Sequence, residues 1–252
     1  MSTLGLDAAD RHVDLNEPGP SERAWRSTLD RVPWSSPIGA DGIAVVVAPH
    51  PDDETLGVGG LLADLFLLGW EVRVVGVTDG EAAHADADAT ARARLAARRR
   101  AEQVAALASL RGPSPAARCS ITRLGIPDGE VAAAHDGVVD AVREALDGAT
   151  WCLGPLAWDG HPDHEACAAA VAAACGDCTP YAEYPIWAWH WATPFIFPVE
   201  RARRVALSPL ARVRKAEALS HFASQYEERD DGPVVPPHVL ARFQRPFEVL
   251  LP

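Results

Sequence analysis

The segment GIAVVVAPHPDDE, residues 42–54, joins an apolar, valine-rich run to a short polar loop. An uninterrupted apolar run of this length is typical of a strand buried on both faces of a parallel sheet. The residues after the loop predict a helix from about Thr55 to Leu68, with Gly69 as the residue that ends it. The segment therefore predicts the first strand–helix unit of an α/β fold, with polar side chains at the carboxyl end of the strand.

Strand-like and helix-like segments alternate over much of the remaining chain. We expect further strands at residues 71–77, 120–124 and 150–153, and further helices at residues 89–110, 137–146 and 165–174. Strands joined through helices lie parallel and connect by right-handed crossovers. We therefore predict one domain at residues 41–252, a Rossmann-like, doubly wound, mostly parallel sheet with helices on both faces. Residues 1–40, polar and with several prolines, predict an N-terminal arm that packs on this domain.

The acidic composition limits the classes of partner. The 252 residues include 35 acidic and 23 basic side chains, for a formal net charge of −12. This charge disfavours broad contact with nucleic-acid phosphates or anionic membranes. No apolar run reaches the ~20 residues that cross a bilayer, and residues 1–16 lack the apolar core of a signal peptide. We expect a cytoplasmic protein with no membrane span and no nucleic-acid partner, while a homo-oligomer stays open.

The five cysteines do not suggest a secreted disulfide framework. Cys175 and Cys178 have the C-x-x-C spacing of redox and zinc sites, but the sequence offers no second ligand pair of that kind. The pair also follows a predicted helix, whereas a thioredoxin-like pair opens one. We interpret it as part of an ordinary loop.

Two loops repeat one pattern of histidine, proline and aspartate. HPDD occupies residues 50–53 after the first predicted strand, and HPDH occupies residues 161–164 after the fourth. In a doubly wound sheet, the loops at the carboxyl ends of the strands gather where ligands bind. A well-capped helix start explains one aspartate, but not a histidine, two aspartates and Glu54 in succession after a buried strand. We therefore predict that both loops line one metal or acid–base site.

Three side chains of these loops form a candidate ligand set. His50 and Asp53, three residues apart, are able to converge on one ion, and His164 completes a set of two imidazoles and one carboxylate. Three protein ligands leave a position for water, as in catalytic zinc sites. A bound ion lowers the pKa of water and polarises a carbonyl. The same ligand types hold non-haem iron, so Zn²⁺ is expected, with Fe²⁺ or another divalent ion left open.

The other polar side chains of the two loops suggest acid–base roles. Asp52 is next to a ligand but less suited to bind the same ion, and is placed to act as a general base. His161 is then able to donate to a developing oxyanion or a leaving group, oriented by Asp163. This set of roles predicts a metal-dependent hydrolase.

The HPDDE loop after the first strand, with the later HPDH, resembles the PIG-L/LmbE-like family of zinc-dependent N-acetylglucosaminyl deacetylases. Further segments are similar to that family: TDGE at residues 78–81, the R-x-x-E spacing of Arg99 and Glu102, LGIPDG at residues 124–129, Lys215, and SQ at residues 224–225. The resemblance covers most of the chain from Val45 onward. It implies removal of an N-acetyl (or other N-acyl) group from an amino-sugar conjugate, a small-molecule GlcNAc-type glycoconjugate.

The resemblance also implies roles for individual residues. It puts zinc on the three candidate ligands named above, makes Asp52 the base, and makes His161 the acid or oxyanion partner with Asp163 as its orienter. It implies that Arg99 and Asp128 face the substrate. Arg99 is one of three successive arginines, and a solvated helix face is an equally good interpretation of it.

Two segments outside the motifs are candidates for substrate contact. His84 lies in an alanine- and aspartate-rich stretch that fits either a substrate lid or a mobile solvated loop. The segment EYPIWAWHW, residues 183–191, holds three tryptophans. Trp187 is a candidate for stacking on a sugar, since aromatic faces line many sugar pockets. The alternative is that the three tryptophans alternate along one buried face of a strand.

Other functions stay open at this stage. A mycothiol-conjugate-type amidase of the same fold would cleave the same kind of bond. Gly57-Val58-Gly59 after a strand, with Asp79 about twenty residues later, is a weak sign of a nucleotide-binding oxidoreductase. A carbohydrate-binding module without catalysis would keep the fold and bind sugar. No G-x-S-x-G motif supports a serine hydrolase.

Overall fold

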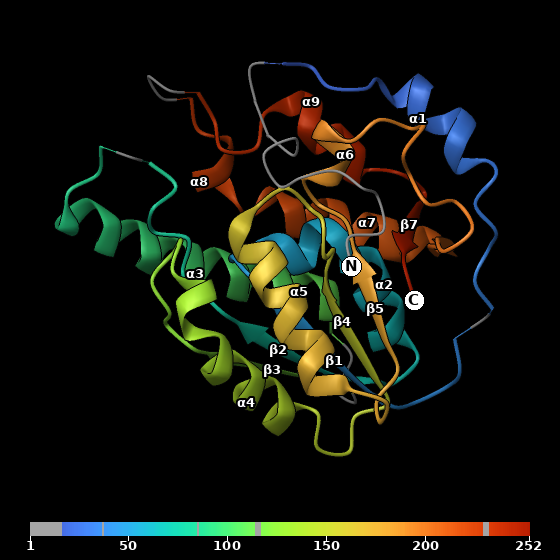
Figure 1. Ribbon diagram of the computed structural model, residues 1–252, viewed down its shortest axis with the longest axis horizontal. Coiled ribbons are helices and arrows are strands. Elements are labelled where there is room, and N and C mark those ends of the chain that lie inside the picture. The colour runs from blue at the N-terminus through green and yellow to red at the C-terminus, as the bar shows by residue number, and fades with distance from the viewer. Residues whose placement is uncertain (1–16, 37, 85, 114–116, 229–231) are drawn as a thin grey trace.

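A computed structural model describes residues 17–36, 38–84, 86–113, 117–228 and 232–252 (Figure 1). Its centre is a parallel sheet of five strands in the order β3-β2-β1-β4-β5. The strands are β1 (Ile43–Ala48), β2 (Glu71–Gly76), β3 (Arg118–Arg123), β4 (Trp151–Pro155) and β5 (Tyr181–Tyr184). The predicted doubly wound parallel sheet is confirmed.

Helices cover both faces of the sheet (Figure 1). One face packs on α2 (Asp53–Leu67) and α3 (Ala89–Arg111), and the other on α4 (His135–Ala145) and α5 (Pro162–Cys175). A further helix, α7 (Pro209–Ser220), packs against α2 and α3. The alternating side chains of β1 divide between the two layers. Val46 belongs to the first hydrophobic cluster, whereas Val45 and Val47 belong to the second. Burial on both faces is why this strand is apolar without interruption.

The strand order reverses next to β1, and this reversal positions the two HPD loops. The chain passes from β1 to β2 on one side, and β4 pairs with β1 on the other side. The loops after β1 and β4 therefore leave the same edge of the sheet, on either side of the switch point. Such a crevice is the usual ligand site of an open α/β sheet.

Several elements of the structure were not among those predicted. They include β5 and a two-stranded antiparallel sheet of β6 (Arg203–Ala206) and β7 (Phe247–Leu250). The new helices are α1 (Glu22–Leu29), α6 (Ala188–Trp191), α7, α8 (Ala223–Tyr226) and α9 (Pro237–Leu240), with 3-10 turns η2 (Val131–Ala134) and η3 (Ala241–Phe243). In α1, the Trp25 side chain is fully buried, and its Nε1 donates to the Trp189 carbonyl at 3.0 Å. Residues 1–16, the first part of the predicted arm and the segment without the apolar core of a signal peptide, lie outside the described residues.

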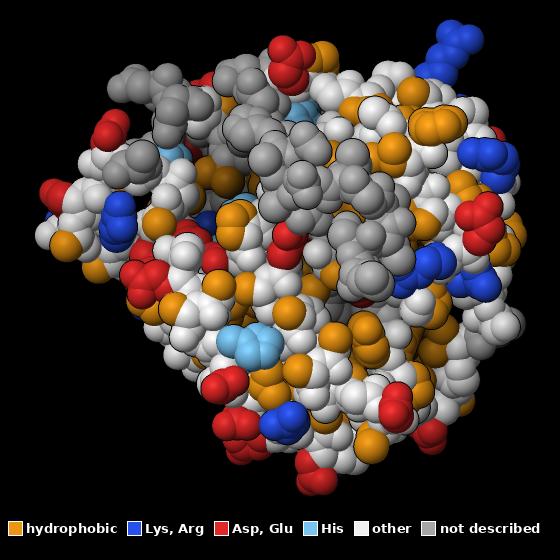
Figure 2. Space-filling view, viewed as in Figure 1, with side chains coloured by type: hydrophobic (Ala, Val, Ile, Leu, Met, Phe, Trp, Pro, Cys, Tyr) orange, Lys and Arg blue, Asp and Glu red, His pale blue; other side chains and the backbone are white. Residues whose placement is uncertain are grey.

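No helix in the described part of the chain is both long and apolar enough to cross a membrane. On the face shown in Figure 2, acidic side chains gather at the left and lower margins, over α3 and α4. All five cysteines are free thiols. Cys175 is the last residue of α5, and Cys178 is exposed in the turn that follows it.

A buried ion pair joins β7 to α7, and both of its side chains bind backbone groups of α2. The carboxylate of Glu248 accepts from the backbone N–H groups of Gly60 and Leu61 at 2.7 and 2.8 Å. Lys215 of α7 donates through Nζ to Glu248 at 2.7 Å and to the carbonyl of Leu56 at 2.7 Å. Hydrogen bonds between both charged groups and the backbone compensate for the burial of the pair. It fixes the helix that begins at the first HPD loop.

The glycines of α2 serve close packing. Gly57 lies inside the helix, and a Cβ added there would come within 2.3 Å of the Tyr184 ring. The Tyr184 hydroxyl donates to the carbonyl of Val47 at 2.7 Å, so the ring is held in place. Gly-Val-Gly is therefore a helix-packing motif and not a phosphate-binding loop. Asp79, the expected ribose ligand, instead pairs with Arg100. The nucleotide-binding interpretation of this motif is wrong.

Gly57→Ala is expected to lower the free energy of unfolding by about 1–3 kcal/mol, because the fixed Tyr184 ring leaves no space for a methyl group. Gly137→Ala is the matched control, since Gly137 is exposed in α4 with no atom within 4 Å of an added Cβ. That change should raise stability by roughly 0.5–1 kcal/mol through helix propensity. Chemical denaturation measures both, and equal stability of the two variants would contradict the packing argument.

Candidate metal centre and active site

The two HPD loops meet in one cavity of about 700 Å³ at the carboxyl edge of the sheet. His50 and His164 are 114 positions apart in sequence, yet Nδ1 of the first lies 3.2 Å from Nε2 of the second. Eight of the residues predicted for the site line this cavity. They are seven residues with ionisable side chains and one tryptophan: His50, Asp52, Asp53, Arg99, Asp128, His161, Asp163 and Trp187. His164 is fully buried behind them.

Three donor atoms form a nearly equilateral triangle. Nδ1 of His50 lies 3.1 Å from Oδ2 of Asp53, and Nε2 of His164 lies 3.2 Å from that same oxygen. The two imidazole nitrogens are 3.2 Å apart. Donors at about 2.0–2.1 Å from a tetrahedral zinc ion lie about 3.3 Å from one another. The triangle therefore fits an ion of this size and leaves a fourth position.

The residues around the triangle favour a cation at its centre. Nε2 of His50 lies 3.2 Å from Asp128 and 3.5 Å from Asp163. Burial opposes charge on His50, yet its hydrogen bonds to Asp128, Asp163 and Asp53 raise its pKa well above the usual value. Burial likewise opposes charge on His164, while Asp53 and a further carboxylate raise its pKa to about 9. Carboxylates thus hold positive charge on both imidazoles, and an ion bound there would take the place of those protons.

Asp159 is a functional residue that the sequence analysis missed. It is fully buried, and its Oδ2 lies 2.8 Å from Nδ1 of His164. The same carboxylate accepts from the backbone N–H groups of Ile186, Trp187 and Ala188 at 2.9–3.1 Å. A carboxylate behind a ligand imidazole fixes the orientation and tautomer of the ring. Its position two residues before the second HPD loop was the available signal.

Asp159→Asn is expected to weaken zinc binding by about 10–100-fold, because a neutral amide supports the His164 ring less strongly than a carboxylate. Competition with a chromophoric chelator measures the affinity. Asp140→Asn, at an exposed position of α4, is the matched control and should bind zinc as tightly as the unmodified protein. Thermal unfolding of both variants checks that the fold is kept. Wild-type affinity in a folded Asp159→Asn protein would contradict the role.

Asp52 has a strained backbone and a buried carboxylate. Its φ of 151° is rare for a residue with a side chain, and such strain is concentrated at functional sites. Burial raises the pKa of Asp52 to about 7, while the Arg99 guanidinium opposes this shift. Nη2 of Arg99 donates to Oδ1 of Asp52 at 3.2 Å, and Nη1 donates to the carbonyl of Gly80 at 2.9 Å. Arg99 is thus buried against the loop, and the solvated-face interpretation is wrong.

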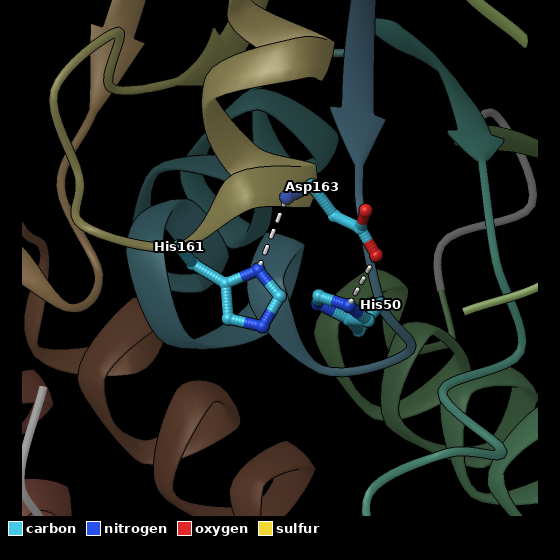
Figure 3. A group of neighbouring side chains, drawn as sticks. All are labelled: His50, His161 and Asp163. Atoms are coloured by element: carbon cyan, nitrogen blue, oxygen red, sulfur yellow. Dashed lines mark hydrogen bonds and ion pairs between the residues drawn. The ribbon is translucent and has the colours of Figure 1, made fainter. Parts of the chain in front are cut away.

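His161 has one ring nitrogen engaged and one directed away from its helix (Figure 3). The backbone N–H of Asp163 donates to Nδ1 of His161 at 3.2 Å. A nitrogen that accepts a hydrogen bond carries no proton, so Nε2 carries it in the neutral ring. Burial and the neighbouring His164 and His50 lower the pKa of His161 to about 3, which keeps the ring neutral. His161 is therefore a neutral N–H donor in the cavity.

The carboxylate of Asp163 makes its hydrogen bonds to groups other than His161. It accepts from the backbone N–H groups of Gly129 and Val131 at 2.8 and 3.4 Å, and lies 3.5 Å from Nε2 of His50 (Figure 3). The hydrogen bond that orients His161 comes from the backbone of Asp163, because His161 is the N-cap of α5. His50, His161 and Asp163 also form a group close enough to hold an ion. The triangle with Asp53 and His164 is the better site, since all three of its residues are buried and its donor atoms lie 3.1–3.2 Å apart.

The remaining candidates divide between the cavity and its surroundings. His84 is buried and lies outside the residues that line the cavity, whereas its neighbours Ala82 and Ala83 line it. Asp128 contacts His50 and accepts from the backbone N–H of Ala82 at 2.9 Å, so it braces the centre as well as facing the cavity.

The three tryptophans of residues 187–191 do not share one face of a strand. The segment forms the short helix α6, which points them in different directions. Trp187 lines the cavity, while Trp189 packs against Trp25 and Trp191 against Trp158. The interpretation as a buried strand face is wrong, because tertiary contacts override the alternating pattern.

Solved structures with a similar fold include enzymes of two reaction types. A deacetylase–teicoplanin complex has a TM-score of 0.59 and 21% identity, covering 83% of this chain and 97% of that one. The A40926 pseudoaglycone deacetylase has a TM-score of 0.55 and 25% identity, covering 85% and 97%. The 4-carboxy-2-hydroxymuconate hydratase from Pseudomonas putida has a TM-score of 0.54 and 17% identity, covering 81% and 83%. The fold alone therefore does not choose the reaction.

Sequence comparison identifies the family. No curated protein sequence matches the chain significantly. The family model for PIG-L, described as GlcNAc-PI de-N-acetylase, matches residues 45–175, which include both HPD loops. Because this match spans more than half of its length, the chain belongs to the PIG-L family.

Proposed function

We propose that the protein is a zinc-dependent deacetylase that hydrolyses the N-acetyl amide of an amino-sugar glycoconjugate. The observation that carries the proposal is the triangle of His50, Asp53 and His164 beside Asp52 in one cavity. Two imidazoles, one carboxylate and an open fourth position are the ligand set of catalytic zinc sites. The PIG-L family match and the deacetylases of similar fold support an N-acetyl amide as the bond that is cleaved.

Asp52 would accept the proton of the attacking water, and Arg99 would hold the Asp52 carboxylate in place. A bound ion would supply a lowered pKa for water and polarisation of the acyl carbonyl. Asp52, whose pKa is about 7, takes the proton from water as the oxygen attacks the carbonyl carbon. Arg99 holds the carboxylate through its hydrogen bond to Oδ1. The proton then passes from Asp52 to the amide nitrogen, and the amine leaves.

His161 would stabilise the charge that develops on the carbonyl oxygen. Its neutral Nε2–H donates to this oxygen as the carbonyl carbon becomes tetrahedral. The backbone N–H of Asp163 fixes the ring so that it does not reorient during the reaction. Preorganised donors of this kind are most effective in a water-poor site. The base, Asp52, thus belongs to the first HPD loop, and the oxyanion donor, His161, belongs to the second.

The test is product analysis with zinc-loaded protein and a series of N-acyl amino sugars. We expect acetate and primary amine in equal amounts from N-acetylglucosaminides. A larger carboxylic acid released from a bulkier conjugate, with no acetate from any N-acetyl sugar, would favour a mycothiol-conjugate-type amidase. Sugar binding without product would favour a carbohydrate-binding module. Neither product from any N-acyl sugar would overturn the proposal.

A further inference from the structure

A second, smaller cavity lies next to the one that holds the metal centre. Leu56 and Phe243 line both cavities. The second cavity has a volume of about 20 Å³, which is room for one water molecule or one monatomic ion. Four charged side chains of the described residues line it, three of them cationic and one anionic: Lys215, Arg242, Arg245 and Glu248. We call this space the cationic cavity.

Arg242 is a buried cation that no carboxylate of the described residues contacts directly. The residue is 4% exposed. Its Nη1 donates to the carbonyl of Trp189, and its Nη2 donates to the carbonyl of Pro18 at 2.7 Å. Both acceptors are neutral. Because a guanidinium does not lose its proton in a protein, the charge stays on Arg242 and needs compensation.

The neighbouring carboxylates are engaged by other groups. Glu248 accepts from Lys215 at 2.7 Å and from two backbone N–H groups of α2. Glu22 forms its ion pair with Arg245 at 2.7 Å, and its side chain is 40% exposed. Burial lowers the pKa of Arg242, and Arg245 adds to this shift while Glu22 opposes it. Three cations therefore share two carboxylates, and one positive charge is left uncompensated.

Two N–H groups of the lining residues have no acceptor in the described part of the chain. Nε of Arg242 is buried and makes no hydrogen bond there. The ammonium group of Lys215 has three N–H groups, and it donates two of them, to Glu248 and to the carbonyl of Leu56. The cationic cavity thus combines excess positive charge, unused donors and space for a single atom.

We propose that the cationic cavity binds one chloride ion, which accepts from Nε of Arg242 and from the third N–H of Lys215. A water molecule would accept the same hydrogen bonds but would leave the charge of Arg242 uncompensated. Carboxylates, sulfate and phosphate are too large for this volume. The ion stabilises the fold, since Arg242 joins η3 to α6 and to the segment before α1. The site does not depend on the deacetylase function.

Thermal unfolding at constant ionic strength tests this site. Chloride is exchanged for gluconate, which is too large for the cavity, over a chloride range of roughly 1–100 mM. The Tm of the protein should rise by roughly 3–5 °C for each tenfold increase in chloride above the dissociation constant, because the ion binds only the folded state. Bromide should replace chloride with a similar effect. The same Tm in chloride and in gluconate would overturn the proposal.

Two arginine variants show whether the effect belongs to this cavity. Arg242→Gln removes the uncompensated charge and should abolish the dependence of Tm on chloride. Arg212→Gln, at an exposed position of α7, makes the same change in net charge and should keep the full dependence. A folded Arg242→Gln protein that responds to chloride as the wild type does would contradict the assignment.

Anomalous X-ray scattering from crystals grown in bromide gives a test that needs no variant. We expect an anomalous peak inside the cationic cavity, within hydrogen-bond distance of Nε of Arg242. This measurement decides the question if Arg242→Gln does not fold. A water molecule at that place, with no anomalous peak, would show that no halide site exists there.

Discussion

Asp52→Asn is expected to lower kcat by roughly 10²–10⁴-fold while the protein keeps its full content of zinc. The amide has the shape of the carboxylate and can still accept from Arg99, but it cannot take a proton. Asparagine differs from aspartate only in the terminal group, so the backbone at this position, with its φ of 151°, should persist. The variant therefore removes the base without removing the loop.

Metal analysis and steady-state kinetics on one preparation check this result. Asp64→Asn is the control, because Asp64 lies on the same helix, outside the cavity, and accepts from the backbone N–H of Ser208 at 3.0 Å. It should keep the wild-type rate. An Asp52→Asn protein that loses zinc would show that Asp52 is a ligand, and one that keeps the full rate would show that it is not the base.

His164→Ala is expected to abolish zinc binding and to lower kcat by roughly 10³-fold or more, since the ion supplies several kcal/mol of stabilisation at tenfold per about 1.4 kcal/mol. The change removes one corner of the donor triangle and leaves two donors. It also leaves the buried Asp159 carboxylate without its imidazole partner, so a moderate loss of stability should accompany the loss of metal.

Chelation of the unmodified protein separates these two effects. Treatment with a strong chelator should remove turnover, and added Zn²⁺ should restore it in the wild type but not in His164→Ala. His135→Ala, at the start of α4 and away from the cavity, should behave as wild type. Full turnover in the metal-free wild-type protein would contradict a metal-dependent mechanism.

The sheet could be predicted from the sequence where burial leaves a simple pattern. β1 is apolar without interruption because both of its faces are covered, and that pattern needs no knowledge of distant residues. β5 could not be predicted, because it has four residues and includes Glu183. Its place at the sheet edge depends on pairing with β4 and on contact of Glu183 with Leu251. Such long-range partners leave no local signal.

The residues of the site also differ in how far they could be predicted from the sequence around them. The HPD loops are local motifs, so the histidines and aspartates of the centre could be named in advance. For Asp159 only its place just before the second loop was a local signal, since the three backbone N–H groups that it accepts from belong to residues 186–188. Likewise the apolar residues that line the cavity include Leu56 of α2 together with Val239 and Phe243, near the C-terminal end of the sequence, and nothing in the sequence distinguishes them from ordinary core residues.

The bond between Glu248 and α2 has a consequence for the order of events during synthesis. Glu248 follows Gly60 by 188 positions. At about 5–20 residues per second, a ribosome needs roughly 10–40 s to add that stretch. Throughout this interval the segment that forms the helix from Asp53 lacks the carboxylate that binds its middle in the folded protein. The backbone N–H groups of Gly60 and Leu61 therefore wait for this partner until β7 is synthesised, and Lys215 waits only for the last 33 positions.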